Sequence, residues 1–285
     1  MPAQSKWPII ASVGLFVFAI GAAAFFQGRT FGPYVFSFGV LILIYMMVGW
    51  FSNVIAESQQ GLYSAQMDRT FRWGMFWFIF SEVMFFAGFF GALFYIRSLS
   101  VPWLGGADNN MATNEFLWPN FQAHWPLMNN PDSKAFPNPG EDMRAWGLPA
   151  VNTFILILSS VTVTIAHHAL IATKRNSLII WLAITVLLGV LFLACQGYEY
   201  FHAYTAMDLK LSSGAYGTTF YMLTGFHGAH VTIGTIMLFI MLVRAIKGHF
   251  QPKNHFAFEA TAWYWHFVDV VWLFLFCYVY IFPLR

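Results

Sequence analysis

Residues 178–201 read LIIWLAITVLLGVLFLACQGYEYF, and no charged side chain occurs in this stretch before Glu199. An α-helix needs about 20 consecutive, predominantly apolar residues to cross the hydrocarbon core of a bilayer. The stretch meets that length, and it begins shortly after the basic pair Lys174 and Arg175. It is therefore predicted to be a transmembrane helix.

Six further apolar runs of comparable length lie at about 8–27, 31–52, 73–96, 149–171, 215–243 and 257–281. The 285 residues are 59% hydrophobic and 9% charged, whereas charged residues make up about 25% of an ordinary soluble domain. That composition excludes a soluble enzyme, a disordered chain and a nucleic-acid-binding domain. We predict an all-α fold, in which residues 1–285 form a single membrane domain of seven transmembrane helices.

The distribution of lysine and arginine predicts the orientation of these helices. Basic residues close to the span ends are more frequent on the side of the N-terminus, where Arg72, Arg175 and Arg244 lie. Because such residues favour the cytoplasmic side, we expect the N-terminus in the cytoplasm. An odd number of spans then places the C-terminus on the opposite side. The segment at about 98–149, rich in proline and tryptophan, becomes a long extracytoplasmic loop.

Glu82 is an acidic residue within the predicted third span. It lies ten residues after Arg72, which is about 15 Å along a helix and thus near the middle of the bilayer. Apolar surroundings favour the neutral form of a carboxyl group, and ionisable residues at this depth are functional candidates. Two interpretations stay open: a carboxyl that handles protons and, the more favoured one, a protonated acid that hydrogen-bonds a neighbouring helix or a lipid.

Polar residues in the last two spans have helical spacings. His227 and His230 are three residues apart, as are His266 and Asp269, and Glu259 lies seven residues before His266 on the same face. Imidazoles at this spacing are compatible with metal ligation, and a carboxylate at this spacing can orient an imidazole. The repeated Glu-x-x-His pairs of di-iron bundles are absent, however. Interhelical polar packing is therefore favoured over a metal site.

Further candidates lie at the span ends. Glu199 lies at the end of the predicted span 178–201, where water is expected to reach it. Glu57 follows the second span close to Trp50, and a tryptophan beside an acid at the interface fits a lipid headgroup contact. A solvated loop acid is the commoner interpretation of Glu57. Arg72 and Arg244 are basic candidates for lipid binding.

Several sequence blocks resemble subunit III of the haem–copper cytochrome c oxidases, and the similarity runs almost from end to end. Shorter matches include Trp50 with Glu57, and the adjacent pair His167 and His168. The longer blocks are RWGM at 72–75 with FIFSEVMFF at 78–86, YGTTF at 216–220 with TGFHGAHV at 224–231, and HFAFEA at 255–260 with AWYWHFVDVVW at 262–272.

The resemblance implies a non-catalytic subunit of a complex that transfers electrons from cytochrome c to oxygen, makes water and pumps protons. Such a subunit carries no haem, copper or other metal centre; it packs against the catalytic subunit I in a complex that also holds subunit II, and it supports proton uptake and stability of subunit I. Its helices form a pair, here about 8–52, and a group of five, here about 73–281, with phospholipids in the cleft between them. Glu82 matches the buried carboxyl of the family, and Trp50 and Glu57 match positions near a lipid headgroup.

The loop at about 98–149 is much longer than in mitochondrial members, which indicates a bacterial oxidase of the inner membrane with this loop in the periplasm. The corresponding subunit of a quinol oxidase is the alternative, although such chains are usually shorter. A hypothesis from another functional class is a self-contained membrane metalloenzyme that uses His227, His230 and His266. A transporter coupled through Glu82 would need inverted repeats and broken helices, and the sequence shows neither.

Overall fold

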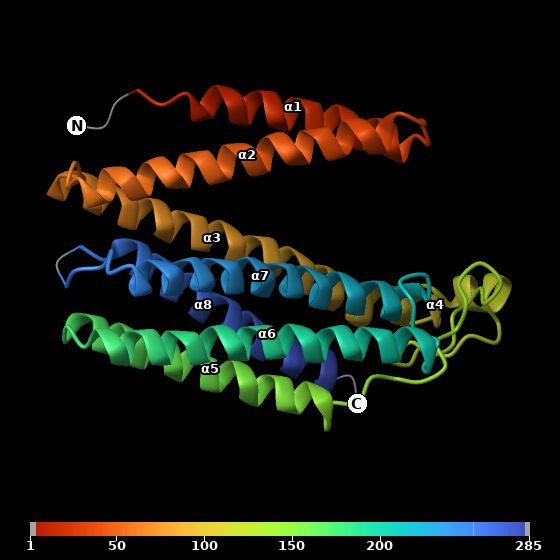
Figure 1. Cartoon of the computed structure of the whole chain (residues 1–285). Coiled ribbons are helices and arrows are strands. Elements are labelled where there is room, and N and C mark those ends of the chain that lie inside the picture. Colours follow the sequence, from red (N-terminus) through yellow and green to blue (C-terminus); the bar gives the residue numbers. More distant parts are fainter. Residues whose placement is uncertain (1–3, 253, 283–285) are drawn as a thin grey trace. The chain divides into compact units, whose positions relative to one another are not determined.

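The regular structure of the chain is helical in the residues that the computed structural model describes, 4–252 and 254–282 (Figure 1). No β-strand occurs in this part of the chain, so the predicted all-α fold is confirmed. The α-helices in these residues are α1 (Trp7–Phe26), α2 (Gly32–Gln59), α3 (Ala65–Tyr95), α4 (Val101–Leu104), α5 (Leu148–Ile171), α6 (Arg175–Thr205), α7 (Gly214–Ile246) and α8 (Phe256–Leu275), and short π-helical turns occupy Ile96–Ser100, Thr113–Leu117 and Phe276–Ile281.

Within the described residues, seven helical segments are long and apolar enough to cross a membrane, which confirms the predicted number of spans. Several run further than predicted. The third extends over Ala65–Leu104 and includes Asp68 and Arg72, whereas the prediction was 73–96 with the loop beginning at 98. Charged side chains do not interrupt the backbone hydrogen bonds of a helix. They mark where it leaves the hydrocarbon core, and not where it ends.

The chain divides into two compact units, Met1–Phe71 and Arg72–Arg285. The first contains α1, α2 and the beginning of α3, and the second contains the rest of α3 together with α4 to α8. The boundary therefore falls inside one continuous helix. The predicted organisation, a helix pair and a group of five within a single membrane domain, stays a prediction.

α1 and α2 form a tight hairpin in the first unit (Figure 1). Gly21 of α1 lies against the backbone of Phe36, and Gly39 of α2 lies against the backbone of Phe18, so that a Cβ atom at either glycine would overlap main-chain atoms. The rings of Phe18 and Phe36 pack together with centroids 4.8 Å apart. Small residues let membrane helices approach closely, and these glycines hold the hairpin together in that way.

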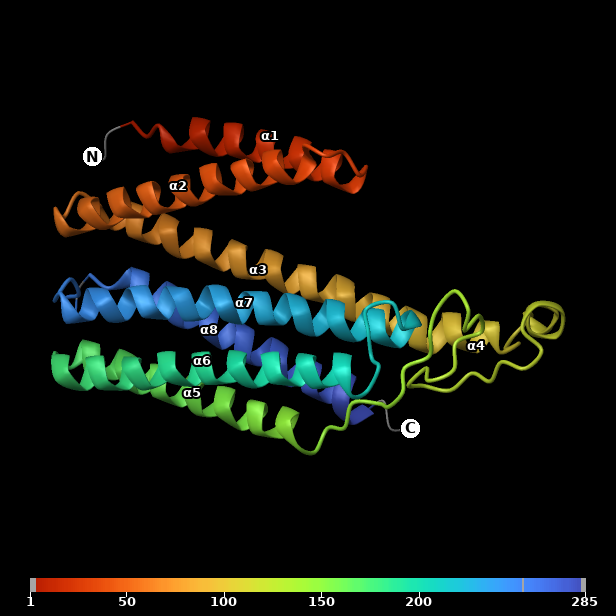
Figure 2. The ribbon, with the colours of Figure 1, turned by 45° about the vertical axis from the view of Figure 1, so that its right-hand side comes forward.

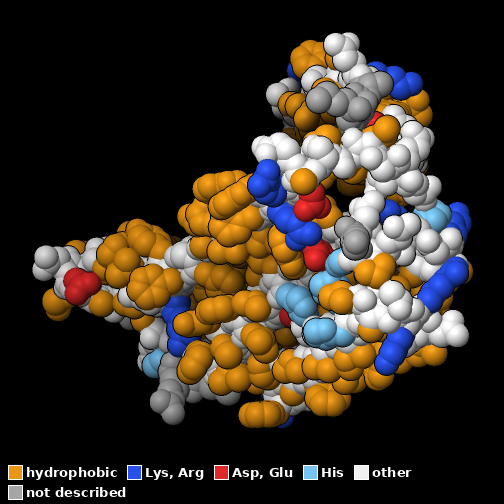
Figure 3. Space-filling model, turned by 90° about the vertical axis from the view of Figure 1, so that its left-hand side faces the viewer, with side chains coloured by type: hydrophobic (Ala, Val, Ile, Leu, Met, Phe, Trp, Pro, Cys, Tyr) orange, Lys and Arg blue, Asp and Glu red, His pale blue; other side chains and the backbone are white. Residues whose placement is uncertain are grey.

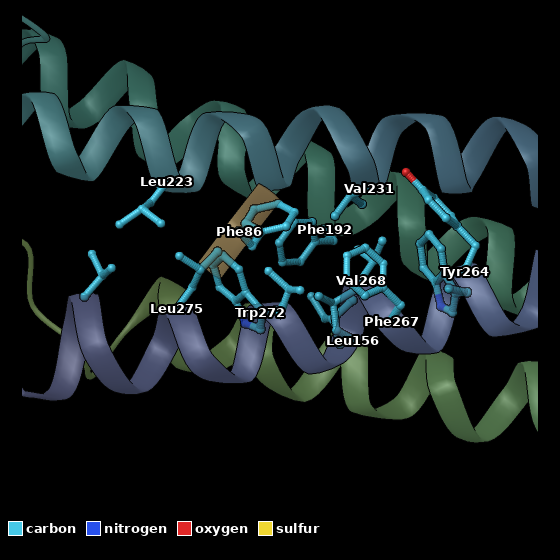
Figure 4. Packing of buried hydrophobic residues seen from close by; sticks show 14 of the residues in the cluster. Phe86, Leu156, Phe192, Leu223, Val231, Tyr264, Phe267, Val268, Trp272 and Leu275 are labelled. Carbon is cyan, nitrogen blue, oxygen red and sulfur yellow. The ribbon is translucent and has the colours of Figure 1, made fainter. Parts of the chain in front are cut away.

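α8 is the central helix of the second unit. It packs against α5 and α7, and α6 packs against the same two helices (Figures 1 and 2). Trp265 and Trp272 on α8 have no exposed surface. Trp272 meets the ring of Phe192 from α6 with centroids 4.8 Å apart, and Leu156 of α5 lies close by (Figure 4). Twelve of the twenty residues of α8 are buried, so this helix supplies a large part of the core of the second unit.

The long segment between α4 and α5 packs onto the ends of the helices of the second unit. Its residues Leu127 and Met143 are buried in the hydrophobic core. The backbone N–H of Met143 donates to the hydroxyl of Tyr216 on α7 at 3.0 Å, and that of Gly140 donates to the carbonyl of Met207 at 2.9 Å. The segment thus contacts the adjoining ends of α6 and α7 (Figure 2).

Candidate functional site

Glu82 of α3 forms a pair with His230 of α7. Its Oε2 lies 2.8 Å from Nε2 of His230, while Nδ1 of the same imidazole lies 2.6 Å from the carbonyl oxygen of Phe226. The rings of Phe85 and Phe86 flank the imidazole, with centroids 5.8 and 4.9 Å away. An ionisable pair thus sits among aromatic side chains, between two membrane-spanning helices.

The hydrogen bonds of His230 constrain where protons can sit. A carbonyl oxygen can only accept, so Nδ1 carries a hydrogen and donates to Phe226. Nε2 then either accepts a hydrogen bond from a protonated Glu82 or, in the imidazolium form, donates one to the carboxylate. In either state the pair shares one further proton between the two atoms. It can hold that proton without leaving an isolated charge in the membrane.

His227 and His266 do not join this pair. His227 is fully buried, and its Nε2 lies 3.2 Å from the carbonyl oxygen of Val268 on α8. His266 faces α5, where its Nδ1 lies 2.6 Å from Oγ of Ser160. The three histidines that a metalloenzyme would use therefore have separate partners and do not converge. Each contact nevertheless joins two helices.

Asp269 is buried in α8 with 7% of its surface exposed. Its spacing from His266 suggested that the carboxylate orients the imidazole. In the structure the hydroxyl of Ser160, on the neighbouring helix, occupies the hydrogen-bonding position at Nδ1 of His266 instead. The suggestion is wrong because helical spacing shows only that two side chains lie on the same face of one helix. It cannot reveal a competing hydrogen-bond partner on a neighbouring helix.

Glu199 is buried, with 3% of its surface exposed, so the prediction that water reaches it is wrong. Its Oε1 accepts a hydrogen bond of 2.7 Å from the hydroxyl of Tyr280, which follows α8. The error has a simple cause. α6 continues to Thr205, so Glu199 lies inside the helix and not at its end, and the C-terminal part of the chain covers it.

A second polar cluster joins the end of α5 to the beginning of α8. Oε1 of Glu259 lies 3.2 Å from Nε2 of His255 and 3.9 Å from Nε2 of His167, and Oε2 of Glu259 forms an ion pair with Arg72 of α3. The two imidazole rings have centroids 5.4 Å apart. We call His167, His255 and Glu259 the α5–α8 cluster.

Sequence reasoning missed the α5–α8 cluster, since it considered Glu259 together with His266. One signal was present: His255 and Glu259 are four residues apart at the start of a helix, a spacing that brings side chains together. His167 lies on a different helix, and no local pattern links it to the other two. Only the packing of α5 against α8 brings the three residues together.

Comparison with known proteins identifies the family. Residues 1–284 match the family described as cytochrome c oxidase subunit III. The chain belongs to that family. A rickettsial protein named "Probable cytochrome c oxidase subunit 3", from Rickettsia conorii, is 39% identical over 281 residues, covering 98% of this chain and 91% of the relative. Proteins named cytochrome c oxidase subunit 3 from Chondrus crispus and Latimeria chalumnae are each 38% identical over 277 residues, which cover 97% of this chain and 90% and 94% of the respective relatives.

Membership of the subunit III family makes this chain a component of an oxidoreductase complex of the respiratory chain, and its seven apolar helices make it a multi-pass membrane protein. The three longest blocks of resemblance fall on α3, α7 and α8, the last beginning at His255 just before α8. The pair of Glu82 and His230 joins the first block to the second. The ion pair of Arg72 and Glu259 joins the first block to the third.

Two lipid-binding candidates of this subunit III lie on α2. Trp50 is 44% exposed, and its ring stacks on that of Phe51 with centroids 5.6 Å apart. Oε2 of Glu57 accepts a hydrogen bond of 2.9 Å from the hydroxyl of Tyr63. Burial and the neighbouring Glu57 raise the pKa of Tyr63, so the phenol stays a neutral donor to that carboxylate. The roles of Trp50 and Glu57 in lipid binding stay predictions.

The two basic candidates differ in their surroundings. Arg244 is 7% exposed, its guanidinium lies 4.6 Å from the ring centroid of Phe250, and its Nε has no hydrogen-bond partner within the described residues. The charge of Arg72, by contrast, is balanced by Glu259. Arg244 is therefore the better candidate for an anionic group supplied from outside the chain.

Proposed function

We propose that this subunit III is a non-catalytic, lipid-binding subunit of a haem–copper oxidase that reduces oxygen to water with electrons from cytochrome c and pumps protons. Its catalytic partner is subunit I. This subunit III contacts subunit I, stabilises the surface where subunit I takes up protons and protects it during turnover. Subunit II belongs to the same complex. The observation that carries this proposal is the pairing of polar groups within the bundle. Each of the three histidines, His227, His230 and His266, hydrogen-bonds to a group on a neighbouring helix. They do not point into a shared open site.

The proposed location is a bacterial inner membrane, with the N-terminus in the cytoplasm and the C-terminus in the periplasm. The rickettsial relatives support a bacterial oxidase, and the excess of basic residues near span ends on the side of the N-terminus supports the orientation. Phospholipids are proposed to lie between the helix pair and the group of five. Exposed Trp50 and buried Arg244 support lipid binding as such, since one suits a membrane interface and the other suits a phosphate group.

The subunit and cofactor content of the purified native complex tests this proposal. We expect the chain to co-purify with a haem–copper subunit and with phospholipids, and the complex to oxidise cytochrome c. Mass spectrometry identifies the subunits and lipids, and optical spectroscopy identifies the haems. A complex that oxidises quinol and not cytochrome c would instead support the quinol oxidase. A redox metal on the separated chain, in stoichiometric amount, would contradict the non-catalytic role.

The pair of Glu82 and His230 tests whether this subunit supports proton uptake only indirectly, through its contact with subunit I, and not by relaying protons through Glu82. We expect Glu82→Gln to keep oxidase turnover and the number of protons pumped per electron close to those of the unaltered enzyme. The glutamine amide can donate to Nε2 of His230 and so preserve the hydrogen bond, although it cannot release a proton. Oxygen uptake and proton release by the complex in vesicles measure both quantities.

Glu82→Ala is the matched control, because it removes the hydrogen bond as well as the carboxyl. Leaving His230 without its partner is expected to lower the free energy of unfolding by about 1–3 kcal/mol, seen as a lower denaturation temperature of the complex. The indirect role would be contradicted if Glu82→Gln slowed turnover about tenfold, the size of effect that a positioned proton-transfer group can reach or exceed, in a fully assembled complex.

A further inference from the structure

The α5–α8 cluster contains the donor atoms of a metal site. One ligand atom from each of His167, His255 and Glu259 lies within 4.8 Å of the other two. No second group of this kind is found among residues 4–252 and 254–282. We propose that these three side chains bind a divalent cation of the zinc type, in exchange with the aqueous phase. This inference does not depend on the role proposed above.

The chemistry of the donors selects the type of cation. Imidazole nitrogen and carboxylate oxygen are common zinc ligands, whereas Mg²⁺ and Ca²⁺ prefer a shell of oxygen atoms. Three protein ligands leave a fourth position for water. Closed structural zinc sites use four protein ligands, so the cluster resembles an open and exchangeable site. Because Zn²⁺ is redox-inactive, its binding adds no electron-transfer centre to the chain.

The distances are close to those of a tetrahedral zinc site. Bonds of about 2.0–2.2 Å in a tetrahedron place the ligand atoms about 3.3–3.6 Å from one another. Nε2 of His255 and Oε1 of Glu259 are 3.2 Å apart, close to the lower end of this range. Nε2 of His167 is 3.9 Å from the same oxygen, and a movement of about 0.3–0.6 Å would bring it to the tetrahedral spacing.

Three of the four imidazole nitrogens of the cluster are buried without a hydrogen-bond partner in the described part of the chain. They are Nε2 of His167 and both ring nitrogens of His255. Buried polar atoms in proteins are nearly always satisfied, and an exception needs an explanation such as a bound ion. A zinc ion bound to both Nε2 atoms would supply the missing partner.

Neighbouring groups hold the three ligands in place. Arg72 engages Oε2 of Glu259 and leaves Oε1 directed to the histidines. The backbone N–H of Glu259 donates to the carbonyl of His255 at 3.2 Å, which fixes the two residues relative to each other. Phe258 packs on the ring of His167 with centroids 5.6 Å apart. Such supporting contacts orient metal ligands, while the positive charge of Arg72 keeps the affinity below that of a closed site.

An ion can reach the cluster from one end of the second unit. The side chains of His167, His255 and Glu259 keep 27%, 12% and 16% of their surface exposed. Figure 3 shows histidine side chains gathered on this end of the molecule. The ligands are thus neither sealed in the bundle nor spread over an open surface, and a hydrated cation can exchange there.

Equilibrium dialysis of the purified oxidase complex against buffered micromolar Zn²⁺ tests the site, with bound zinc counted per copy of this subunit. We expect His255→Ala to remove about one zinc per complex, because two ligands hold the ion far more weakly than three. His168→Ala is the matched control, since His168 neighbours His167 at the same helix end but does not belong to the cluster. It should leave the amount of bound zinc unchanged.

Two results would overturn the proposal: equal zinc binding by His255→Ala and the unaltered complex, or an equal loss with His168→Ala. If His255→Ala fails to assemble, a measurement on the unaltered complex replaces it. Anomalous diffraction at the zinc absorption edge from zinc-soaked crystals should show a peak between His167, His255 and Glu259. A map with zinc elsewhere and no peak at this position would exclude the site.

Discussion

Trp265→Ala is expected to lower the free energy of unfolding of the second unit by about 3–5 kcal/mol, the range found when large aromatic side chains are removed from packed cores. Trp265 has no exposed surface. Its ring lies against Gly189 of α6 and Gly234 of α7, and its Nε1 donates to Oγ of Ser159 on α5 at 2.9 Å. One side chain of α8 thus contacts three other helices.

The size of this effect follows from packing, because lipid tails are as apolar as the bundle interior and offer little hydrophobic driving force between helices. Deleting the indole removes close contacts with three helices and leaves a cavity. It also leaves the hydroxyl of Ser159 without a donor. The loss is read as a lower denaturation temperature for the complex by scanning calorimetry, together with release of this subunit during purification.

Trp263→Ala is the control for this prediction. Trp263 lies on the same helix and is 37% exposed, so its removal leaves no closed cavity and should change the free energy of unfolding by much less. Equal destabilisation by the two variants would show that α8 tolerates loss of its central tryptophan as well as loss of a peripheral one. The role of Trp265 as the packing centre would then be wrong.

The membrane-spanning helices are the part of this fold that sequence predicts well. A bilayer requires each spanning segment to be apolar and to satisfy its own backbone hydrogen bonds, so hydropathy alone locates the segments. Helix ends obey no such requirement. Residues such as Asp68, Arg72 and Glu199 were placed at or beyond the predicted ends, although the structure places all three inside continuous helices.

The partners of the polar residues could not be predicted in the same way. Glu82 was expected to bond to a neighbouring helix or a lipid, and nothing local identifies His230 as its partner on α7. The contact depends on how α3 and α7 are rotated about their axes, which is set by the packing of many apolar side chains. The same reasoning explains why His266 was linked to Asp269 and why Ser160 was missed.

The family resemblance could be read from sequence because it rests on characteristic sequence blocks and not on pairwise contacts. It locates residues without giving their geometry, however. Glu259 illustrates this difference: its block is distinctive, yet its interactions with His167, His255 and Arg72 come from three separate elements. A cluster of this kind becomes visible only when the helices are assembled.

Gly21→Leu is expected to open the hairpin of α1 and α2 in the first unit. A side chain at Gly21 would overlap the backbone of Phe36, and backbone cannot move aside as a flexible side chain can. The helices should separate locally toward the distance of about 8–10 Å that ordinary side chains impose. The accompanying loss in the free energy of unfolding should be at least about 1–3 kcal/mol, the usual cost of overpacking.

Distances between spin labels on the outer faces of α1 and α2 measure this opening, in a background in which the free cysteines Cys195 and Cys277 are replaced. Ala23→Leu is the matched control, because it adds the same kind of bulk to an exposed position on α1 and should leave the distance distribution unchanged. An unchanged distribution in Gly21→Leu as well would show that the glycine contacts do not set the separation of the helices. Because lipids are proposed to bind beside this hairpin, its opening should also release phospholipid from the purified complex, whereas Ala23→Leu should retain it.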